Sequence, residues 1–157
     1  MANNTKVILE GLIFSECPRW YDGRLWFSDM LDHKVIAVDP DGNAETIAEV
    51  PGQPGGLGFL PDGRLLIVSM TDQRLLRMDP DGLSEVADLS SLAVGNCNDM
   101  VVDLQGRAYI GDWGFVESVP GAPKDTAHLI LVTPEGKTSV VASKVSVSYT
   151  HLTLPTK

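Results

Sequence analysis

Apolar positions along the chain come in short runs, and each run is closed by a polar turn. Three runs share one pattern and read WYDGRLWFSD, FLPDGRLLIVS and VDLQGRAYIGD. Their turn glycines are Gly23, Gly63 and Gly106, so successive copies lie 40 and 43 residues apart. A second turn follows each copy, reading DPDG, DPDG and TPEG. A repeat of about 40 residues built from short strands is typical of β-propeller blades, so we predict an all-β propeller.

The central copy predicts a complete four-stranded blade. Its strands are expected over Gly56–Leu60, Arg64–Ser69, Leu75–Met78 and Ser84–Ala87. The residues from Leu65 to Val68 are all apolar, which suits a strand covered on both faces by neighbouring blades. Asp-Gly and Pro-Asp-Gly supply the positive φ angles that tight hairpins need.

The other two copies follow the same plan. The first blade is expected over Cys17–Ala48, and the third begins near Asp99. An insertion rich in glycine and proline, from Gly114 to about Thr126, separates the second and third strands of the third blade. It is either a functional surface loop or a plain variable loop. The last two strands are expected over His128–Val132 and Ser139–Ala142.

The two ends of the chain depart from the repeat. Residues Lys6–Leu12 predict an outer strand that closes a propeller ring, with partners expected from a region beyond this chain. Residues 145–157, VSVSYTHLTLPTK, contain no blade turn and resemble a non-native artefact tail. We therefore expect residues 1–144 to form part of a propeller domain. Propellers close with about four to eight blades, so three blades predict a truncated ring.

Composition narrows the class of partner. The 157 residues are 43% hydrophobic and 21% charged, with a net charge of −9. This balance predicts a soluble globular protein and argues against nucleic acid or anionic membrane as a partner. No apolar run reaches the length of a membrane helix, and no secretory signal precedes the first blade. Cys17 and Cys97 are the only cysteines, which favours a reduced, cytoplasmic protein.

Aligning the copies predicts a site. Trp20, Phe59 and Val102 match, and counting back four residues gives Glu16, Gly55 and Asn98. These positions precede the innermost strands, so Glu16 and Asn98 are expected to face a common axial pocket, with room left by Gly55 and Gly56. Carboxylate and amide oxygens suit Ca²⁺ or Mg²⁺, and Zn²⁺ or Mn²⁺ also take oxygen ligands. The alternative is a solvated acid and a turn-forming asparagine.

Other chemistry is less well supported. His33, His128 and His151 have no ligand-like neighbour at the spacings that metal sites use. There is no G-x-S-x-G elbow, and Gly55-Gly56-Leu57-Gly58 is not followed by a helix or by the lysine of a phosphate loop. Asp112-Trp113-Gly114-Phe115 ends an inner strand, where Trp113 either walls the pocket or belongs to the core.

The segments FSECPRW and NCNDMVVDLQGRAYIGD, with the repeated DGRLWFSD-type strands, resemble the SMP-30/gluconolactonase family of regucalcin-like lactonases. The resemblance spans about residues 7–142 and covers the N-terminal half of a member. It implies a six-bladed propeller with one axial divalent cation and hydrolysis of sugar-acid lactones.

By the same resemblance, Glu16 is a metal ligand and Asn98 contacts substrate. Asn96 is the second substrate-binding candidate; it stands where the family has an arginine, so the identity of the substrate is left open. Cys17 replaces a residue that is commonly glycine. The remaining ligands, one of them the catalytic acid/base aspartate, are expected in the missing half. No catalytic residue is therefore predicted in this chain, and the chain alone should be inactive.

Three functions follow as hypotheses. The first is a fragment of a metal-dependent lactonase whose partner is a small-molecule lactone. The alternative is a non-catalytic propeller that displays a binding surface. A third is a half-propeller that pairs with a second copy, although an open blade face more often causes aggregation.

Overall fold

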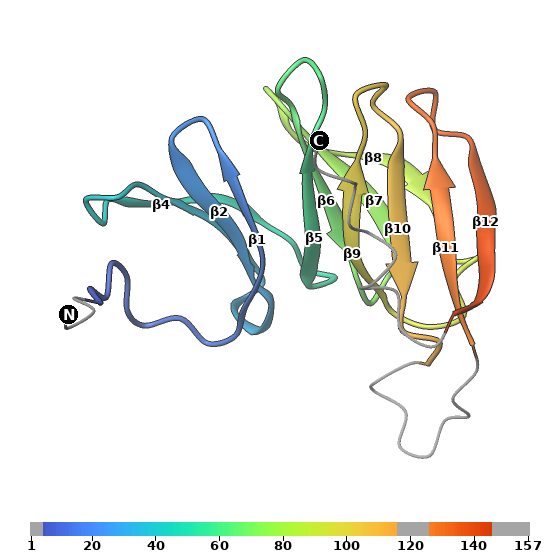
Figure 1. The fold of residues 1–157 in the computed structure, drawn as a ribbon, viewed down its shortest axis with the longest axis horizontal. Helices are drawn as coiled ribbons and strands as arrows, with labels where there is room; N and C mark the ends of the chain where they lie inside the picture. The colour runs from blue at the N-terminus through green and yellow to red at the C-terminus, as the bar shows by residue number, and fades with distance from the viewer. Residues whose placement is uncertain (1–4, 116–125, 146–157) are drawn as a thin grey trace.

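The computed structural model describes residues 5–115 and 126–145, which form three four-stranded antiparallel sheets (Figure 1). Blade one consists of β1 (Ser15–Tyr21), β2 (Arg24–Asp29), β3 (Lys34–Val38) and β4 (Ala44–Glu49), with a 3₁₀ turn, η1 (Met30–Asp32), after β2. Blade two consists of β5 (Pro54–Phe59), β6 (Leu65–Ser69), β7 (Arg74–Asp79) and β8 (Gly82–Asp88). Blade three consists of β9 (Cys97–Val102), β10 (Ala108–Asp112), β11 (Ala127–Val132) and β12 (Thr138–Val145).

Each sheet follows the chain order, so each blade is an up-and-down meander. This architecture confirms the predicted all-β fold with three four-stranded propeller blades. The predicted strand boundaries lie within a few residues of the observed ones. One assignment needs correction, because Asp112 ends β10, the second strand of its blade, and not an inner strand. In the described part of the chain, no helix has the length and apolar character needed to cross a membrane.

The turn glycines adopt the conformation that the repeat required. Gly23, Gly63 and Gly106 have φ angles of 73°, 87° and 76°, in the left-handed region where a Cβ is unfavourable. Gly42, Gly82 and Gly136, which end the second turns, also have positive φ. The spacing of the repeat is therefore set by backbone geometry at these two turns of each blade.

Apolar strand residues bury the faces between blades. Leu65, Leu66, Ile67 and Val68 of β6 are each at most 4% exposed, which confirms that this strand is covered on both sides. One face packs with blade one and the other with blade three. The second strand of blade two thus lies between two apolar clusters, one shared with each neighbouring blade.

Three aromatic rings join blades one and two. Tyr21 stacks on Phe59 with ring centroids 3.7 Å apart, and Trp26 meets the edge of Phe59 at 5.2 Å. Phe59 belongs to β5, whereas Tyr21 and Trp26 belong to the first hairpin. Such aromatic pairs add specific geometry to the apolar burial.

Glycines in β5 allow the backbones of two blades to come close. A Cβ on Gly56 would lie 2.5 Å from the amide nitrogen of Met100 in β9, and one on Gly55 would lie 2.8 Å from Cγ of Met70. We expected Gly55 and Gly56 to leave room for a ligand, and that expectation is wrong. The space beside them is filled by β9 and by Met70, because the inner strands of a propeller converge near its axis.

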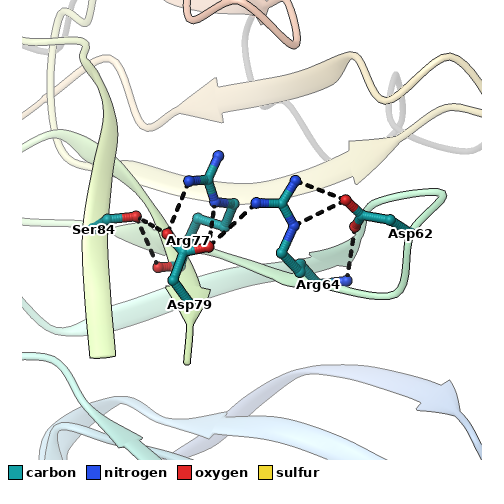
Figure 2. A network of polar contacts seen from close by, with 5 residues as sticks. All are labelled: Asp62, Arg64, Arg77, Asp79 and Ser84. Atoms are coloured by element: carbon teal, nitrogen blue, oxygen red, sulfur yellow. Dashed lines mark hydrogen bonds and ion pairs between the residues drawn. The ribbon is translucent and has the colours of Figure 1, made fainter. Parts of the chain in front are cut away.

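Charged residues link the outer parts of blade two (Figure 2). Arg77 donates two hydrogen bonds of 2.8 Å to Asp79, and Ser84 donates a third to the same carboxylate. Arg64 binds Asp62 at 2.7 Å and reaches Asp79 at 3.3 Å. The hydrogen bonds from Arg77 and Ser84 hold the pKa of Asp79 well below its usual range. This network ties β6, β7 and β8 together at the surface.

The segment before blade one forms no strand over residues 5–12. Leu9 and Leu12 instead pack against Phe27, Ile36 and Val38 on blade one. The expected ring-closing role of Lys6–Leu12 stays a prediction. Residues 146–157 of the expected artefact tail and most of the blade-three insertion lie outside the described residues.

The close approach of β5 and β9 makes a prediction about stability. Gly56→Ala should lower the free energy of unfolding by about 2 kcal/mol, because the added methyl meets backbone atoms that cannot rotate away. Gly58→Ala is the matched control, since its methyl would meet side-chain atoms of Val102 and Met100 and no backbone atom among its nearest neighbours. Urea unfolding followed by circular dichroism measures both. Equal losses in the two variants would contradict the argument.

Candidate functional site

The inner strands of the three blades share one register. Each pairs with its second strand through an equivalent residue pair, namely Trp20–Leu25, Phe59–Leu65 and Val102–Ala108. Each then carries one extra residue, a β-bulge, nearer its beginning. Past the bulge the strands return to register at Ser15–Asp29, Pro54–Ser69 and Cys97–Asp112.

This register places Glu16, Gly55 and Asn98 at equivalent positions, one residue after the returned pair. The sequence alignment of these three residues is therefore correct in space. The bulge follows each of them, and bulges next to functional sites often re-aim a side chain.

Two further sets of equivalent residues lie beside these positions. Two residues earlier in the chain are Phe14, Gln53 and Asn96. Directly after the second strand of each blade are Met30, Met70 and Trp113. The three sets come from the same end of the three blades.

A pocket of about 310 Å³ opens where these sets meet. It is lined by Phe14, Glu16, Met30, Leu31, Gln53, Asn98 and Trp113. All of these residues except Leu31 belong to one of the three equivalent sets. The pocket is thus a product of the repeat, and Gln53, Phe14 and Met30 are members that sequence reasoning missed. Counting back two more residues from Glu16 and Gly55 would have found Phe14 and Gln53.

Blade two contributes less to the pocket than its neighbours. Gly55 has no side chain, and Met70 is fully buried with its thioether against Gly55. Gln53, with a φ of 64°, is the lining residue of this blade.

The two predicted polar residues differ in their surroundings. Glu16 is exposed, and its carboxylate makes no hydrogen bond or ion pair with the residues that the structure describes. Asn98 is 3% exposed, so its amide lies at the buried end of the lining. Asn96 is also buried, at 4% exposed, and does not line the pocket. Its predicted contact with substrate stays a prediction.

The donor atoms around the pocket are of the kind that hard cations bind. Glu16 offers a carboxylate, while Asn98 and Gln53 offer amide oxygens. Among residues 5–115 and 126–145, however, no three His, Cys, Asp or Glu residues cluster as a metal site would require. These residues therefore fit a divalent cation as part of an oxygen ligand set, and do not complete one.

A buried carboxylate fixes the entry to blade one. Asp29, 1% exposed at the end of β2, accepts hydrogen bonds from the backbone amides of Ile13 at 2.9 Å and Phe14 at 2.7 Å. The amide of Met30 donates in turn to the carbonyl of Phe14 at 2.9 Å. Two lining residues, Phe14 and Met30, are thereby held in place.

Asp112 has the equivalent role in blade three. It is fully buried and accepts hydrogen bonds from the amides of Val94 at 3.1 Å, Gly114 at 2.6 Å and His128 at 3.1 Å. These contacts fix the loops on both sides of Trp113. The signal in the sequence was the acidic residue that ends two of the three repeat copies.

The histidines have structural contacts. Nδ1 of His33 lies 3.2 Å from the carbonyl oxygen of Val50, and Nδ1 of His128 lies 2.7 Å from that of Leu92. Neither histidine lines the pocket. His151 lies outside the described residues.

An ion pair joins blades one and three beside the site. Nη2 of Arg19 lies 2.5 Å from Oδ1 of Asp99 and donates to the carbonyl of Met100 at 2.7 Å. Both charged side chains are mostly buried, at 30% and 22% exposed. The pair therefore fixes the first inner strand against the third, three residues from Glu16 and one from Asn98.

Cys17 lies within the bulge that follows Glu16. It has a φ of 54°, the left-handed conformation that favours glycine, and its side chain is buried. Burial, and then the charge of Asp99, raises the pKa of the Cys17 thiol above its ordinary range. Burial together with Asp112 raises the pKa of Cys97 to about 12.

Comparisons with known proteins agree with this architecture. The family model for the SMP-30/Gluconolactonase/LRE-like region matches residues 14–151. The fold is similar to that of a gluconolactonase from Xanthomonas campestris, with 20% identity and a TM-score of 0.72 over 87% of this chain and 49% of that one. No curated protein sequence matches the chain significantly.

Two other solved structures share the fold. One is the calcium-binding protein regucalcin from Agrobacterium tumefaciens, with 20% identity and a TM-score of 0.64 over 89% of this chain and 46% of that one. The other is a luciferin-regenerating enzyme, with 16% identity and a TM-score of 0.69 over 88% of this chain and 48% of that one. The chain spans about half the length of these solved structures.

The partly buried ion pair leads us to predict an energetic coupling between Arg19 and Asp99 in the stability of the fold. A double-mutant cycle with Arg19→Ala and Asp99→Ala should give a coupling energy of about 1 kcal/mol, because both partners are shielded from water. The control is the more exposed pair Arg24–Glu45, for which a cycle should give less than about 0.5 kcal/mol. Urea unfolding measures both cycles, and equal coupling in the two would count against the role of Arg19.

The raised thiol pKa values make a prediction about pH. An unfolded thiol loses its proton near pH ~8.5, whereas the folded Cys97 thiol keeps its proton up to a pKa of about 12. The unfolded state therefore binds fewer protons in this window, and stability should fall as pH rises, by up to about 1.4 kcal/mol per pH unit for each cysteine. Cys97→Ala should show a shallower fall between pH 9 and 11. Identical slopes in the variant and the original chain would show the prediction to be wrong.

Proposed function

Because the chain belongs to the SMP-30/gluconolactonase/LRE-like family, we propose that it supplies three blades of a six-bladed, metal-dependent hydrolase that opens sugar-acid lactones. The observation that carries the proposal is the position of Glu16 and Asn98 in the fold. The strand registers bring these two residues to equivalent positions, and both line one pocket.

The proposed roles follow from the donor atoms. Glu16 provides one carboxylate ligand to a divalent cation, for which Ca²⁺, Mg²⁺, Mn²⁺ and Zn²⁺ are candidates. When bound, such a cation supplies polarisation of the lactone carbonyl and a lowered pKa for water. The Asn98 amide donates a hydrogen bond to an oxygen of the lactone and so orients the ester group. A carboxylate that moves protons in the reaction would come from the remaining blades.

The surrounding contacts support this assignment. Asp29 and the Arg19–Asp99 ion pair fix the backbone on either side of Glu16 and Asn98. Such positioning matters in catalysis, since misplacement by about 1 Å can cost roughly 100-fold in rate. We propose that Arg19 and Asp29 are positioning residues that do not touch the lactone.

The cellular setting is part of the proposal. Cys17 and Cys97 are free thiols and both are buried. Unpaired cysteines fit a reducing compartment, so we propose that the protein works in the cytoplasm on a small-molecule lactone.

A binding propeller without catalysis is the second candidate. The observation in its favour is the single carboxylate at the pocket and the lack of a three-residue ligand cluster in the described part of the chain. In that case the pocket would hold a ligand with Asn98 and Gln53 and would perform no chemistry.

Hydrolysis of glucono-δ-lactone distinguishes these candidates. The purified 157-residue chain should show no turnover with any of the four cations, whereas the complete propeller should be active. In the complete protein, Glu16→Gln should lower kcat/KM by at least about 100-fold, because a metal ligand is lost. The matched control, Glu135→Gln, lies in an outer turn of blade three and should leave activity unchanged. Metal-dependent turnover by the isolated chain, or full activity of the Glu16 variant, would overturn the assignment.

A further inference from the structure

The walls of the pocket are more apolar than a sugar-binding site needs. Four of its seven lining residues are hydrophobic, namely Phe14, Met30, Leu31 and Trp113. The polar ones are Glu16, Gln53 and Asn98. Among the lining residues that the structure describes, none is Lys, Arg or His.

Backbone hydrogen bonds hold three of the apolar wall residues, and two of the apolar side chains are exposed to a ligand. Phe14 and Met30 are fixed through Asp29 and through the Met30–Phe14 backbone hydrogen bond of 2.9 Å. The amide of Trp113 donates to the carbonyl of Asn96 at 3.0 Å, and its ring stacks on Phe115 at 5.7 Å. Phe14 and Leu31 are nevertheless 49% and 52% exposed. Large apolar side chains that stay exposed around a polar floor mark a site for an apolar ligand group.

The lining residues should bind polyhydroxylated lactones and lactones with an alkyl or aryl substituent with different affinities. An ester group only accepts hydrogen bonds, and the amide NH₂ groups of Gln53 and Asn98 can donate them, while the Glu16 carboxylate serves the proposed cation. Each hydroxyl of a sugar-acid lactone that loses water without gaining a partner costs about 1–3 kcal/mol. An alkyl or aryl substituent against Phe14, Leu31 and Trp113 gains about 0.8 kcal/mol for each CH₂ group that is buried.

We infer that the pocket selects lactones with an apolar alkyl or aryl substituent over polyhydroxylated lactones, with Phe14, Leu31 and Trp113 as the residues that determine this specificity. The inference rests on the proposed function for the lactone ring itself. It goes beyond that function by ranking the lactones: those with an apolar substituent bind more tightly than the sugar-acid lactones.

Ligand binding tests the inference apart from turnover. Trp113 lines the pocket, so its fluorescence should change when a lactone binds to the 157-residue chain. The probes are δ-decalactone, which carries a pentyl chain, the unsubstituted δ-valerolactone and glucono-δ-lactone, all with six-membered rings. We expect δ-decalactone to bind at least tenfold more tightly than either of the others, and Trp113→Phe to remove the signal.

Leu31→Ser isolates the contribution of the wall. Leu31 is exposed, so its replacement should leave the fold unchanged, as circular dichroism would verify. It should weaken δ-decalactone binding about threefold to tenfold and leave δ-valerolactone binding unchanged. Leu104→Ser, at a residue 92% exposed in a turn of blade three, is the matched control and should change neither.

The outcomes separate the inference from the proposed function. Tight binding of δ-decalactone to the chain, without hydrolysis of any lactone by the complete protein, would remove the proposed activity and keep the assigned ligand class. Equal or tighter binding of glucono-δ-lactone would overturn the inference even if the complete protein hydrolyses it. Absence of binding by all three lactones, or an unchanged δ-decalactone affinity in Leu31→Ser, would overturn it as well.

Discussion

The extra residue in each inner strand is the constraint on which the pocket depends. Side chains alternate between the two faces of a strand, so residues four apart normally share a face. Here Trp20 pairs with Leu25 and Glu16 with Ser28, and these partners lie three residues apart on β2. Glu16 therefore faces the opposite side from Trp20. The same shift occurs in β5 and β9, so one backbone irregularity, repeated three times, turns a set of equivalent residues toward the same space.

The parts of the fold that depend on local chemistry were predictable from the sequence. Turn glycines such as Gly23 and Gly63 need positive φ, and their spacing gave the strands, the blades and the equivalence of Glu16 with Asn98. The rest depends on tertiary contacts. The sequence suggested free space beside Gly56, because nothing in it indicates that the backbone of Met100, from another blade, fills that space. The acid Asp29 was visible as part of the repeat, but its partners are backbone amides 15 and 16 residues away.

The blades share one scaffold and differ in what they contribute. Blade one provides the exposed carboxylate and three apolar wall residues, and blade three provides a buried amide and a tryptophan. In blade two the position equivalent to Glu16 and Asn98 is Gly55, which is covered by Met70 and serves packing. The surface network of Arg64, Arg77 and Asp79 on that blade joins the turn before β6 to β7. Blade two packs against both neighbouring blades, and ion pairs connect its own strands, so it holds the three blades together.

Met70 over Gly55 has a consequence for how such a pocket can change. The two residues are equivalent to Glu16 and Met30 of blade one, but here they pack against each other and fill the space. A larger side chain at Gly55 would need a smaller one at Met70, so the two positions must vary as a pair. In blade one the equivalent positions hold Glu16, which is exposed, and Met30, and both line the pocket. The residues at these positions can therefore differ from blade to blade. Three blades with the same turns can in this way form a binding site that is not symmetric.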